Sequence, residues 1–189
     1  MDRAMPTWKL VCYSAAIIAT PFLGHALGDI SNVRYLRQVV ESIPVLVCLG
    51  FVLRLPKRST LQMPLPARVP LLVLPFLLLS FTSEVTATDI EPGFFVLAVV
   101  DAVAIGVSEE LTFRLSLHRL WSQYGAAFYV MASSLIFGLA HYADGLSAIL
   151  VTAVVGGLFA LARIAGMPIV VLILLHGFID LPGQLSRIP

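Results

Sequence analysis

The chain has 189 residues, 59% of them hydrophobic and only 12% charged, with a formal net charge of +1. A soluble domain carries about 25% charged residues, so this composition excludes an ordinary soluble protein and indicates a membrane protein. The near-zero charge gives no reason to expect nucleic acid as a partner. The length suits one all-α transmembrane domain over residues 1–189, a polytopic helical bundle of about seven spans.

Three spans are predicted in the first half of the chain. The first follows Arg3 and Lys9 and is expected to stay uncleaved, because Pro21 and Gly24 do not suit a signal-peptide cleavage region. The loop after the second span is basic and broken by prolines, and the loop after the third span is acidic. In chain order these segments are the spans 10–27 and 39–55, the basic loop 54–68, the third span 69–81 and the acidic loop 84–92.

Four more spans are predicted in the second half. In the sixth of the seven, Thr152, Gly156 and Ala160 recur at four-residue spacing, the small-residue pattern of closely packed membrane helices. Pro168 suits the first turn of the seventh span. In chain order the segments are the span 93–121, the turn 122–125, the span 126–141, the turn 142–145, the span 146–164 and a last span from 168 to about 183.

Lysine and arginine are distributed unevenly between the two ends of the predicted spans. Nine lie at the N-terminus or in the second, fourth and sixth loops, and three lie on the other side. Because cytoplasmic loops carry the excess of basic residues, this predicts a multi-pass protein of the cell (cytoplasmic) membrane with its N-terminus in the cytoplasm. The nine are Arg3, Lys9, Arg54, Lys57, Arg58, Arg68, Arg114, Arg119 and Arg163, and the three are Arg34, Arg37 and Arg187.

Two adjacent carboxylates, Glu109 and Glu110, lie inside the apolar fourth span. Burying a carboxylate costs several kcal/mol unless it is paired or used, so acids in a span indicate function. Glu110 and Arg114 are four residues apart, share a helix face and can form an ion pair. Glu109 points about 100° away from Glu110. We therefore expect Glu110 to form a structural pair with Arg114 and to point away from the site, and Glu109 to be free for chemistry.

Four polar side chains from three spans are predicted to lie at a common depth. At about 1.5 Å per residue from the nearest turn on the basic side, Glu109 lies about 18 Å deep and Asp180 about 20 Å. His141 lies about 26 Å deep and His176 about 14 Å, so all four fall in a slab about 12 Å thick. Spacing alone leaves a polar packing network and a polar cavity both open. The other polar residues in spans are expected to be interhelical hydrogen-bonding groups, His25 and Asp101, with a cavity-lining role also open for Asp101.

Three motifs stand in order on apolar helices: Glu109-Glu110-x-x-x-Arg114, Phe137-x-x-x-His141 and His176-x-x-x-Asp180. Together they resemble the CAAX protease and bacteriocin-processing (CPBP/Abi) family, whose best-known branch is the type II CAAX prenyl endopeptidase (Ras-converting enzyme). The resemblance covers roughly residues 93–183, while residues 1–92 carry no recognised motif. It implies that residues 93–183 form the catalytic core helices of an intramembrane protease.

The resemblance implies a glutamic-type protease that uses no metal and no cofactor. Glu109 would act as the general base that activates a water, and His141 would hold and polarise that water. His176 and the residue at position 180 would stabilise the tetrahedral oxyanion. The residues that would brace this site are Glu110 and Arg114.

Position 180 departs from the prenyl-endopeptidase branch, because Asp180 stands where that branch has asparagine. An ionised aspartate cannot donate a hydrogen bond to an oxyanion. Asp180 is therefore expected either to orient His176, as the acid does in a Ser-His-Asp arrangement, or to be protonated itself.

The implied partners are the lipid bilayer and a membrane-bound peptide or protein substrate, cut in its C-terminal tail or its leader. Prenylated CAAX tails are one option, beside bacteriocin leaders and C-terminal sorting signals. Other functions remain open for the same residues. A zinc metalloprotease could use Glu and two His as ligands. A non-catalytic membrane immunity or scaffold protein and a proton-coupled transporter are also possible, although no inverted repeat supports transport.

Overall fold

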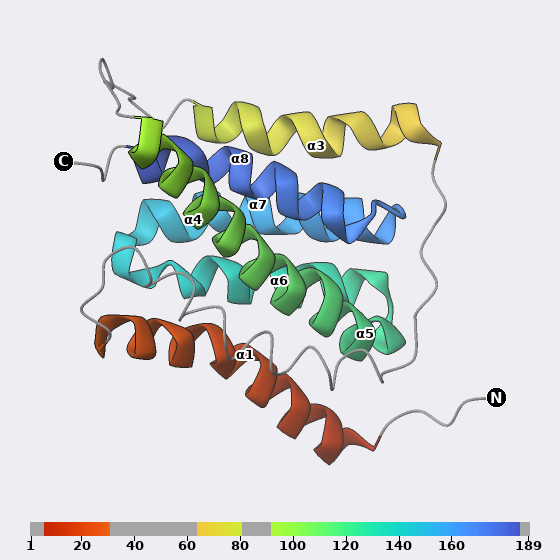
Figure 1. Cartoon of the computed structure of the whole chain (residues 1–189). Helices are drawn as coiled ribbons and strands as arrows, with labels where there is room; N and C mark the ends of the chain where they lie inside the picture. The colour runs from red at the N-terminus through yellow and green to blue at the C-terminus, as the bar shows by residue number, and fades with distance from the viewer. Residues whose placement is uncertain (1–5, 31–63, 81–91, 186–189) are drawn as a thin grey trace.

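The computed structural model describes residues 6–30, 64–80 and 92–185, and all regular structure in these ranges is helical. The predicted all-α class is therefore confirmed for the described part of the chain. The helices, shown in Figure 1, are α1 (Thr7–Ile30), α3 (Leu65–Ser80), α4 (Pro92–Glu110), α5 (Leu117–Trp121), α6 (Ala126–Ala140), α7 (Leu146–Ile164) and α8 (Ile169–Leu185), with a π-helical segment η1 (Leu111–Ser116) between α4 and α5.

Several predicted boundaries agree with these helices, and α7 covers the whole predicted sixth span, residues 146–164. The helix α3 begins at Leu65, earlier than predicted, so Arg68 lies in this helix and not in the preceding loop. The predicted second span, residues 39–55, lies outside the described residues, as do the loop residues up to 63 and most of the acidic loop. The number of seven spans therefore stays a prediction. The side chain of His25 also lies outside the described part.

The helices α4 and α8 form one closely packed pair. A Cβ atom added at Gly106 of α4 would lie 2.7 Å from the carbonyl oxygen of Ile173 on α8. A Cβ atom at Gly177 of α8 would lie 3.1 Å from the carbonyl oxygen of Ala102 on α4. Because neither contact leaves room for a side chain, these two glycines set the separation of the backbones. This pair carries Glu109, Glu110, His176 and Asp180.

The helices α6 and α7 form a second close pair, which uses the small residues predicted from the sequence. A Cβ atom at Gly156 of α7 would lie 2.8 Å from the ring of Phe137 on α6. A Cβ atom at Gly138 of α6 would lie 2.6 Å from the carbonyl oxygen of Ile149 on α7. The Ser134 hydroxyl adds a hydrogen bond of 2.5 Å to the carbonyl oxygen of Ala153. The pair places Phe137 against α7.

The helix predicted over residues 93–121 is interrupted, which corrects the expectation of one continuous α-helix. Between α4 and α5, η1 has the wider π-helical pattern, and the Ser116 hydroxyl donates a 2.6 Å hydrogen bond to the Leu111 carbonyl oxygen five residues earlier. Every residue of η1 and α5 is buried. Such π segments change which side chains share a face, and they are frequent at functional sites. Glu109 and Glu110 lie directly before the change.

The core forms around η1 and α5, which supply Phe113, Leu117 and Trp121 to the main apolar cluster. The helix α1 packs against both segments, and the Trp121 Nε1 donates a 2.7 Å hydrogen bond to the Ser14 hydroxyl of α1. The helix α3 lies along α7 and α8 (Figure 1). The buried segment η1 is thus packed against α1, α6, α7 and α8.

Two glycines end the turns before α6 and α7. Gly125 has φ 102° and follows the 3-10 turn Ser122–Tyr124, and Gly145 has φ 91° and follows the 3-10 turn Tyr142–Asp144. These left-handed values favour glycine, which has no Cβ to clash. Both turns lie where the sequence predicts them. His141 is the residue between α6 and the second turn.

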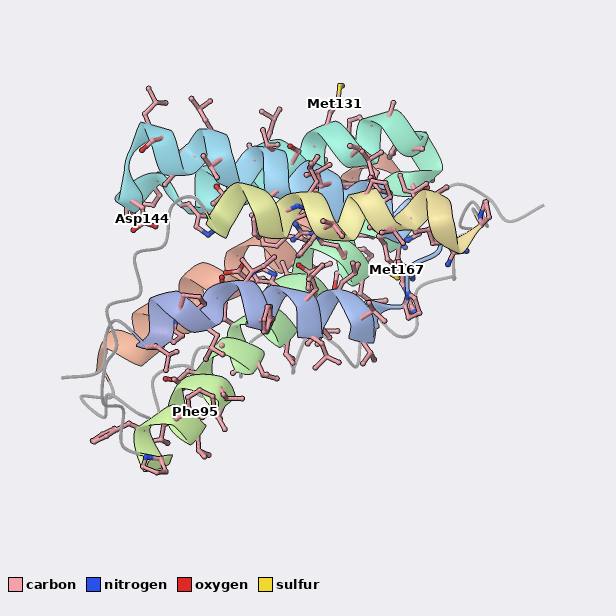
Figure 2. The ribbon with its side chains drawn as sticks, turned by 90° about the horizontal axis from the view of Figure 1, so that it is seen from above. Phe95, Met131, Asp144 and Met167 are labelled. Atoms are coloured by element: carbon pink, nitrogen blue, oxygen red, sulfur yellow. The ribbon has the colours of Figure 1, made fainter. Side chains whose placement is uncertain are left out.

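The outer faces of the helices are apolar. Along α6, Met131, Leu135 and Leu139 are all exposed at four-residue spacing, and Figure 2 shows Met131 pointing away from the bundle. The same spacing gives an exposed apolar stripe on α7 and on α8. Among the described helices, α7 is the one long and apolar enough to cross a membrane by itself, and α6 and α8 are shorter apolar helices. The exposed residues of the other two stripes are Leu146, Leu150 and Val154 on α7, and Val170, Leu174 and Phe178 on α8.

Candidate active site

His176 lies at the centre of the cluster of titratable side chains. Its Nδ1 donates a 2.8 Å hydrogen bond to Oε1 of Glu110. Its Nε2 lies 3.4 Å from Oε2 of Glu109 and 3.4 Å from Oδ2 of Asp180. Three carboxylates from two helices therefore surround one imidazole, which is itself only 8% exposed.

The ion pair predicted between Glu110 and Arg114 is present. Arg114 Nη1 lies 3.2 Å from Glu110 Oε1, and both side chains are completely buried. The guanidinium lies over three aromatic rings, 4.3 Å from the ring centroid of Phe137, 5.4 Å from that of Phe159 and 5.6 Å from that of Phe113. Stacking on aromatic faces suits a planar, weakly hydrated cation in a dry interior.

Glu110 does not face away from the site, and this part of the sequence prediction is wrong. The same oxygen, Oε1, that pairs with Arg114 also accepts the hydrogen bond from His176. The helical spacing predicted the first contact, but it contains no information about α8. Glu110 thus links the buried arginine to the histidine.

Glu109 and Glu110 differ sharply in their access to solvent. The side chain of Glu109 is 23% exposed, whereas that of Glu110 is not exposed at all. Within the described residues, the Oε2 atoms of both glutamates are buried and make no hydrogen bond. The side chain of Asp180, across from Glu109, is 27% exposed. Of the two adjacent glutamates, only Glu109 is partly exposed.

His141 lies beside this cluster and not inside it. Within the described residues, it makes no hydrogen bond or ion pair with Glu109, His176 or Asp180. Its Nδ1 lies 2.9 Å from the carbonyl oxygen of Phe137, the preceding turn of its own helix. Because a carbonyl only accepts, Nδ1 carries the proton, and Nε2 of the neutral ring is left as an acceptor. The Phe137 ring connects the two histidines, 5.0 Å from His141 and 6.0 Å from His176 between centroids.

The contacts of His176 limit which atoms in this cluster can carry a proton. With Nδ1 of His176 donating to Glu110, a lone pair on Nε2 would face the carboxylates of Glu109 and Asp180. That arrangement is repulsive unless Nε2 or one of the two facing carboxyl groups carries a proton. At least one proton is therefore expected on Nε2 of His176 or on the carboxyl group of Glu109 or Asp180.

Phe159 and Tyr129 are buried at the site and were missed by sequence reasoning. The ring of Phe159 on α7 lies 5.7 Å from that of His176. The Tyr129 hydroxyl on α6 donates a 3.2 Å hydrogen bond to the carbonyl oxygen of Phe113 in η1. Both side chains are fully buried. No pattern in the sequence separates these aromatic residues from ordinary core residues.

Asp101 lies two helical turns before Glu109 on α4 and is half-buried. No group of three or more His, Cys, Asp or Glu side chains in the described part of the chain has an arrangement that could hold a metal ion.

A comparison with models of known protein families gives a match in the second half of the chain. Comparisons with curated proteins and with solved structures give no match. Residues 91–182 match the family model described as Type II CAAX prenyl endopeptidase Rce1-like. That range contains all three motifs, from Glu109 to Asp180. Over residues 91–182, just under half of its length, the chain is therefore similar to the type II CAAX prenyl endopeptidase Rce1-like family.

Proposed function

We propose that this protein is an intramembrane endopeptidase that cuts a peptide bond in the tail or leader of a membrane-associated peptide or protein, with a glutamate-activated water and no metal. Similarity to this family implies protease activity. The observation that carries the mechanism is the contrast between two neighbouring carboxylates. Glu110 is completely buried between Arg114 and His176, while the side chain of Glu109 is 23% exposed.

In the proposed mechanism, Glu109 removes a proton from a water molecule, and the resulting hydroxide adds to the carbonyl carbon of the scissile bond. The negative charge that forms on the carbonyl oxygen is stabilised by a proton on His176 Nε2, which faces the same side as Glu109. Glu109 then returns the proton to the leaving nitrogen, and the C–N bond breaks.

His141 and Asp180 have supporting roles in this proposal. The free acceptor Nε2 of His141 receives a hydrogen bond from the attacking water and so provides its second anchor. Asp180 lies 3.4 Å from His176 Nε2, on the reacting side of the ring, while Glu110 holds Nδ1 as the acid does in a Ser-His-Asp triad. An aspartate in this position serves the histidine and does not contact the oxyanion.

The apolar exterior supports a protein that crosses the membrane several times. Only 28% of the apolar stretch of α7 is buried, and the exposed stripes of α6, α7 and α8 consist of large apolar side chains. Exposed apolar faces of this extent are costly in water and are favourable in lipid. The family is membrane-embedded. We propose a multi-pass protein of the cytoplasmic membrane with its N-terminus in the cytoplasm, as the distribution of basic residues predicts.

Cleavage by the purified protein in lipid vesicles tests this function. One probe is an internally quenched peptide with a farnesylated CAAX tail, and a second is an N-acylated leader peptide without a prenyl group. Cleavage of either probe that is lost in Glu109→Gln supports the proposal, and the probe that is cut identifies the substrate class. Cleavage of neither, or full cleavage by Glu109→Gln, would contradict it.

A further inference from the structure

The helix α7 contacts the proposed active site without contributing any residue to the three motifs. Its Phe159 is completely buried and touches two members of the cluster. The ring centroid of Phe159 lies 5.7 Å from that of His176 on α8, with the planes at 67°. The centroid also lies 5.4 Å from the guanidinium carbon of Arg114 in η1.

These contacts close a ring of four side chains. Phe159 contacts Arg114, Arg114 pairs with Glu110 at 3.2 Å, Glu110 accepts a 2.8 Å hydrogen bond from His176, and His176 contacts Phe159. The backbone of α7 joins the same ring, because Arg114 Nη2 donates to the carbonyl oxygen of Gly156 at 3.4 Å. Each member is therefore held from two sides.

The hydrogen bond from Nδ1 to Glu110 fixes only one direction of the His176 ring. Correlated rotations about the Cα–Cβ and Cβ–Cγ bonds can still tilt the imidazole within the tolerance of that hydrogen bond and so move Nε2 relative to Glu109 and Asp180. The rings of Phe137 and Phe159 come from two different helices and contact the imidazole at 6.0 Å and 5.7 Å. Together they restrict the plane of the ring, which the hydrogen bond alone does not.

We propose that Phe159 is a positioning residue for the proposed proteolytic reaction, which holds the His176 imidazole in the plane that directs Nε2 toward Glu109 and Asp180. This inference rests on the proposed function. Phe159 acts through two other residues, because its ring also holds the Arg114 guanidinium that fixes Glu110. An aliphatic side chain of similar size would fill the space but would provide neither the flat surface for the imidazole nor the π face for the cation.

The test compares Phe159→Leu and Phe159→Met with Leu172→Val. Leucine and methionine keep an apolar side chain but remove the ring, and methionine adapts to irregular spaces if leucine packs badly. Leu172 is equally buried and belongs to the apolar cluster of Ala162 and Met167, so Leu172→Val is a matched core change that lies one helical turn before His176 but outside the ring of four.

The kinetic measurement uses whichever of the two vesicle probes is cut. Small misplacement of a reacting group lowers the rate strongly, so we expect kcat to fall about tenfold to a hundredfold in both Phe159 variants, with KM changed less than about twofold. Leu172→Val should keep kcat within about twofold. A Phe159→Tyr variant keeps the ring and should recover most of the lost kcat.

The second measurement needs no substrate. The ¹⁵N and proton signals of the His176 ring, assigned by comparison with His176→Gln, report the hydrogen bond from Nδ1 to Glu110. In the Phe159→Leu and Phe159→Met variants we expect the Nδ1 proton signal to broaden or disappear, while Leu172→Val leaves it unchanged. Unchanged His176 signals in both Phe159 variants, or equal changes in Leu172→Val, would overturn the positioning role.

The two measurements separate the failure of this inference from the failure of the proposed function. If neither vesicle probe is cut, the proteolytic function fails, and the histidine signals still decide whether Phe159 positions His176. If the probes are cut and the Phe159 variants keep the wild-type kcat and His176 signals, the function stands and the positioning role is wrong.

Discussion

At the scale of single residues, the proposed chemistry depends on the different surroundings of two adjacent glutamates. Glu110 is fully buried and contacts both Arg114 and His176, so its negative charge is balanced by groups inside the protein. Glu109 points to the partly exposed side, where Asp180 also lies. The site thus has a fully buried side, formed by Glu110 and Arg114, and a partly exposed side, formed by Glu109 and Asp180.

The first prediction compares the two glutamates. Glu109→Gln keeps the shape but removes the base, so the rate of probe cleavage should fall by about two orders of magnitude or more with little change in thermal stability. Glu110→Gln should instead destabilise the protein by about 3–5 kcal/mol, because Arg114 would remain buried without its counter-charge. Cleavage assays and thermal unfolding in detergent measure both effects. Glu110→Gln with wild-type stability would contradict this division of roles.

The second prediction concerns Asp180. Because asparagine serves at this position in the prenyl-endopeptidase branch, Asp180→Asn should lower the cleavage rate much less than Glu109→Gln. His141→Ala should approach the loss seen in Glu109→Gln, since the water would lose its second anchor. The same probe and the same vesicles give all three rates. A milder effect for His141→Ala than for Asp180→Asn would show that His141 has no place in the reaction.

The third prediction separates a glutamate-activated water from a zinc-bound water. EDTA and phenanthroline should leave the cleavage rate unchanged, and purified protein should contain less than one equivalent of metal by elemental analysis. Loss of activity that zinc restores would instead assign metal-ligand roles to Glu109, His141 and His176. Adding the zinc–EDTA complex is the control for effects of the chelator itself.

At the scale of elements, close helix packing brings the residues of the site together. The pair α4–α8 carries the acids and the central histidine, and its separation is set at Gly106 and Gly177. The pair α6–α7 brings in the aromatic rings that hold Arg114 and His176. The π segment η1 connects α4 to the buried α5.

The fourth prediction tests the α4–α8 contact with two glycines of the same helix. In Gly106→Ala the new methyl group would meet the Ile173 carbonyl oxygen at 2.7 Å, so the helices must separate. We expect a loss of about 1–3 kcal/mol in stability and a lower cleavage rate, because His176 would move away from Glu109. Gly93→Ala is the control, since nothing lies within 4 Å of its position. Equal melting temperatures for the two variants would contradict a packing role for Gly106.

At the scale of the whole molecule, the apolar exterior and the basic asymmetry together predict an orientation in the membrane. The exposed turns on either side of α6 should lie on opposite sides of the bilayer. The turn before α6 is expected in the cytoplasm and the turn after it on the outer side.

The fifth prediction tests this orientation by cysteine labelling in intact cells. In a background with Cys12 and Cys48 replaced by serine, a membrane-impermeant maleimide should label Ala143→Cys from outside. It should label Ala126→Cys only after the membrane is permeabilised. Both alanines are exposed in the structure, so a lack of labelling does not come from burial within the protein. The reverse pattern would overturn the predicted topology.

Local features of the fold could be predicted from the sequence because helical periodicity and turn residues act over a few positions. The limits of α7 follow from an apolar run that begins after Gly145, and the Glu110–Arg114 pair follows from four-residue spacing. The small-residue pattern around Gly156 likewise predicted the close approach of another helix. The three ordered motifs identified the family that the comparison then matched.

Only the tertiary structure shows how the helices are rotated and shifted relative to one another, and therefore which side chains meet. The hydrogen bond between Glu110 and His176 joins residues 66 positions apart, and no spacing rule reaches across that separation. The π segment, the place of His141 beside the cluster and the contact of Phe159 with His176 are likewise not given by helical spacing. A periodic pattern states which face of a helix is buried. The identity of the side chain that meets that face is determined only when the bundle packs.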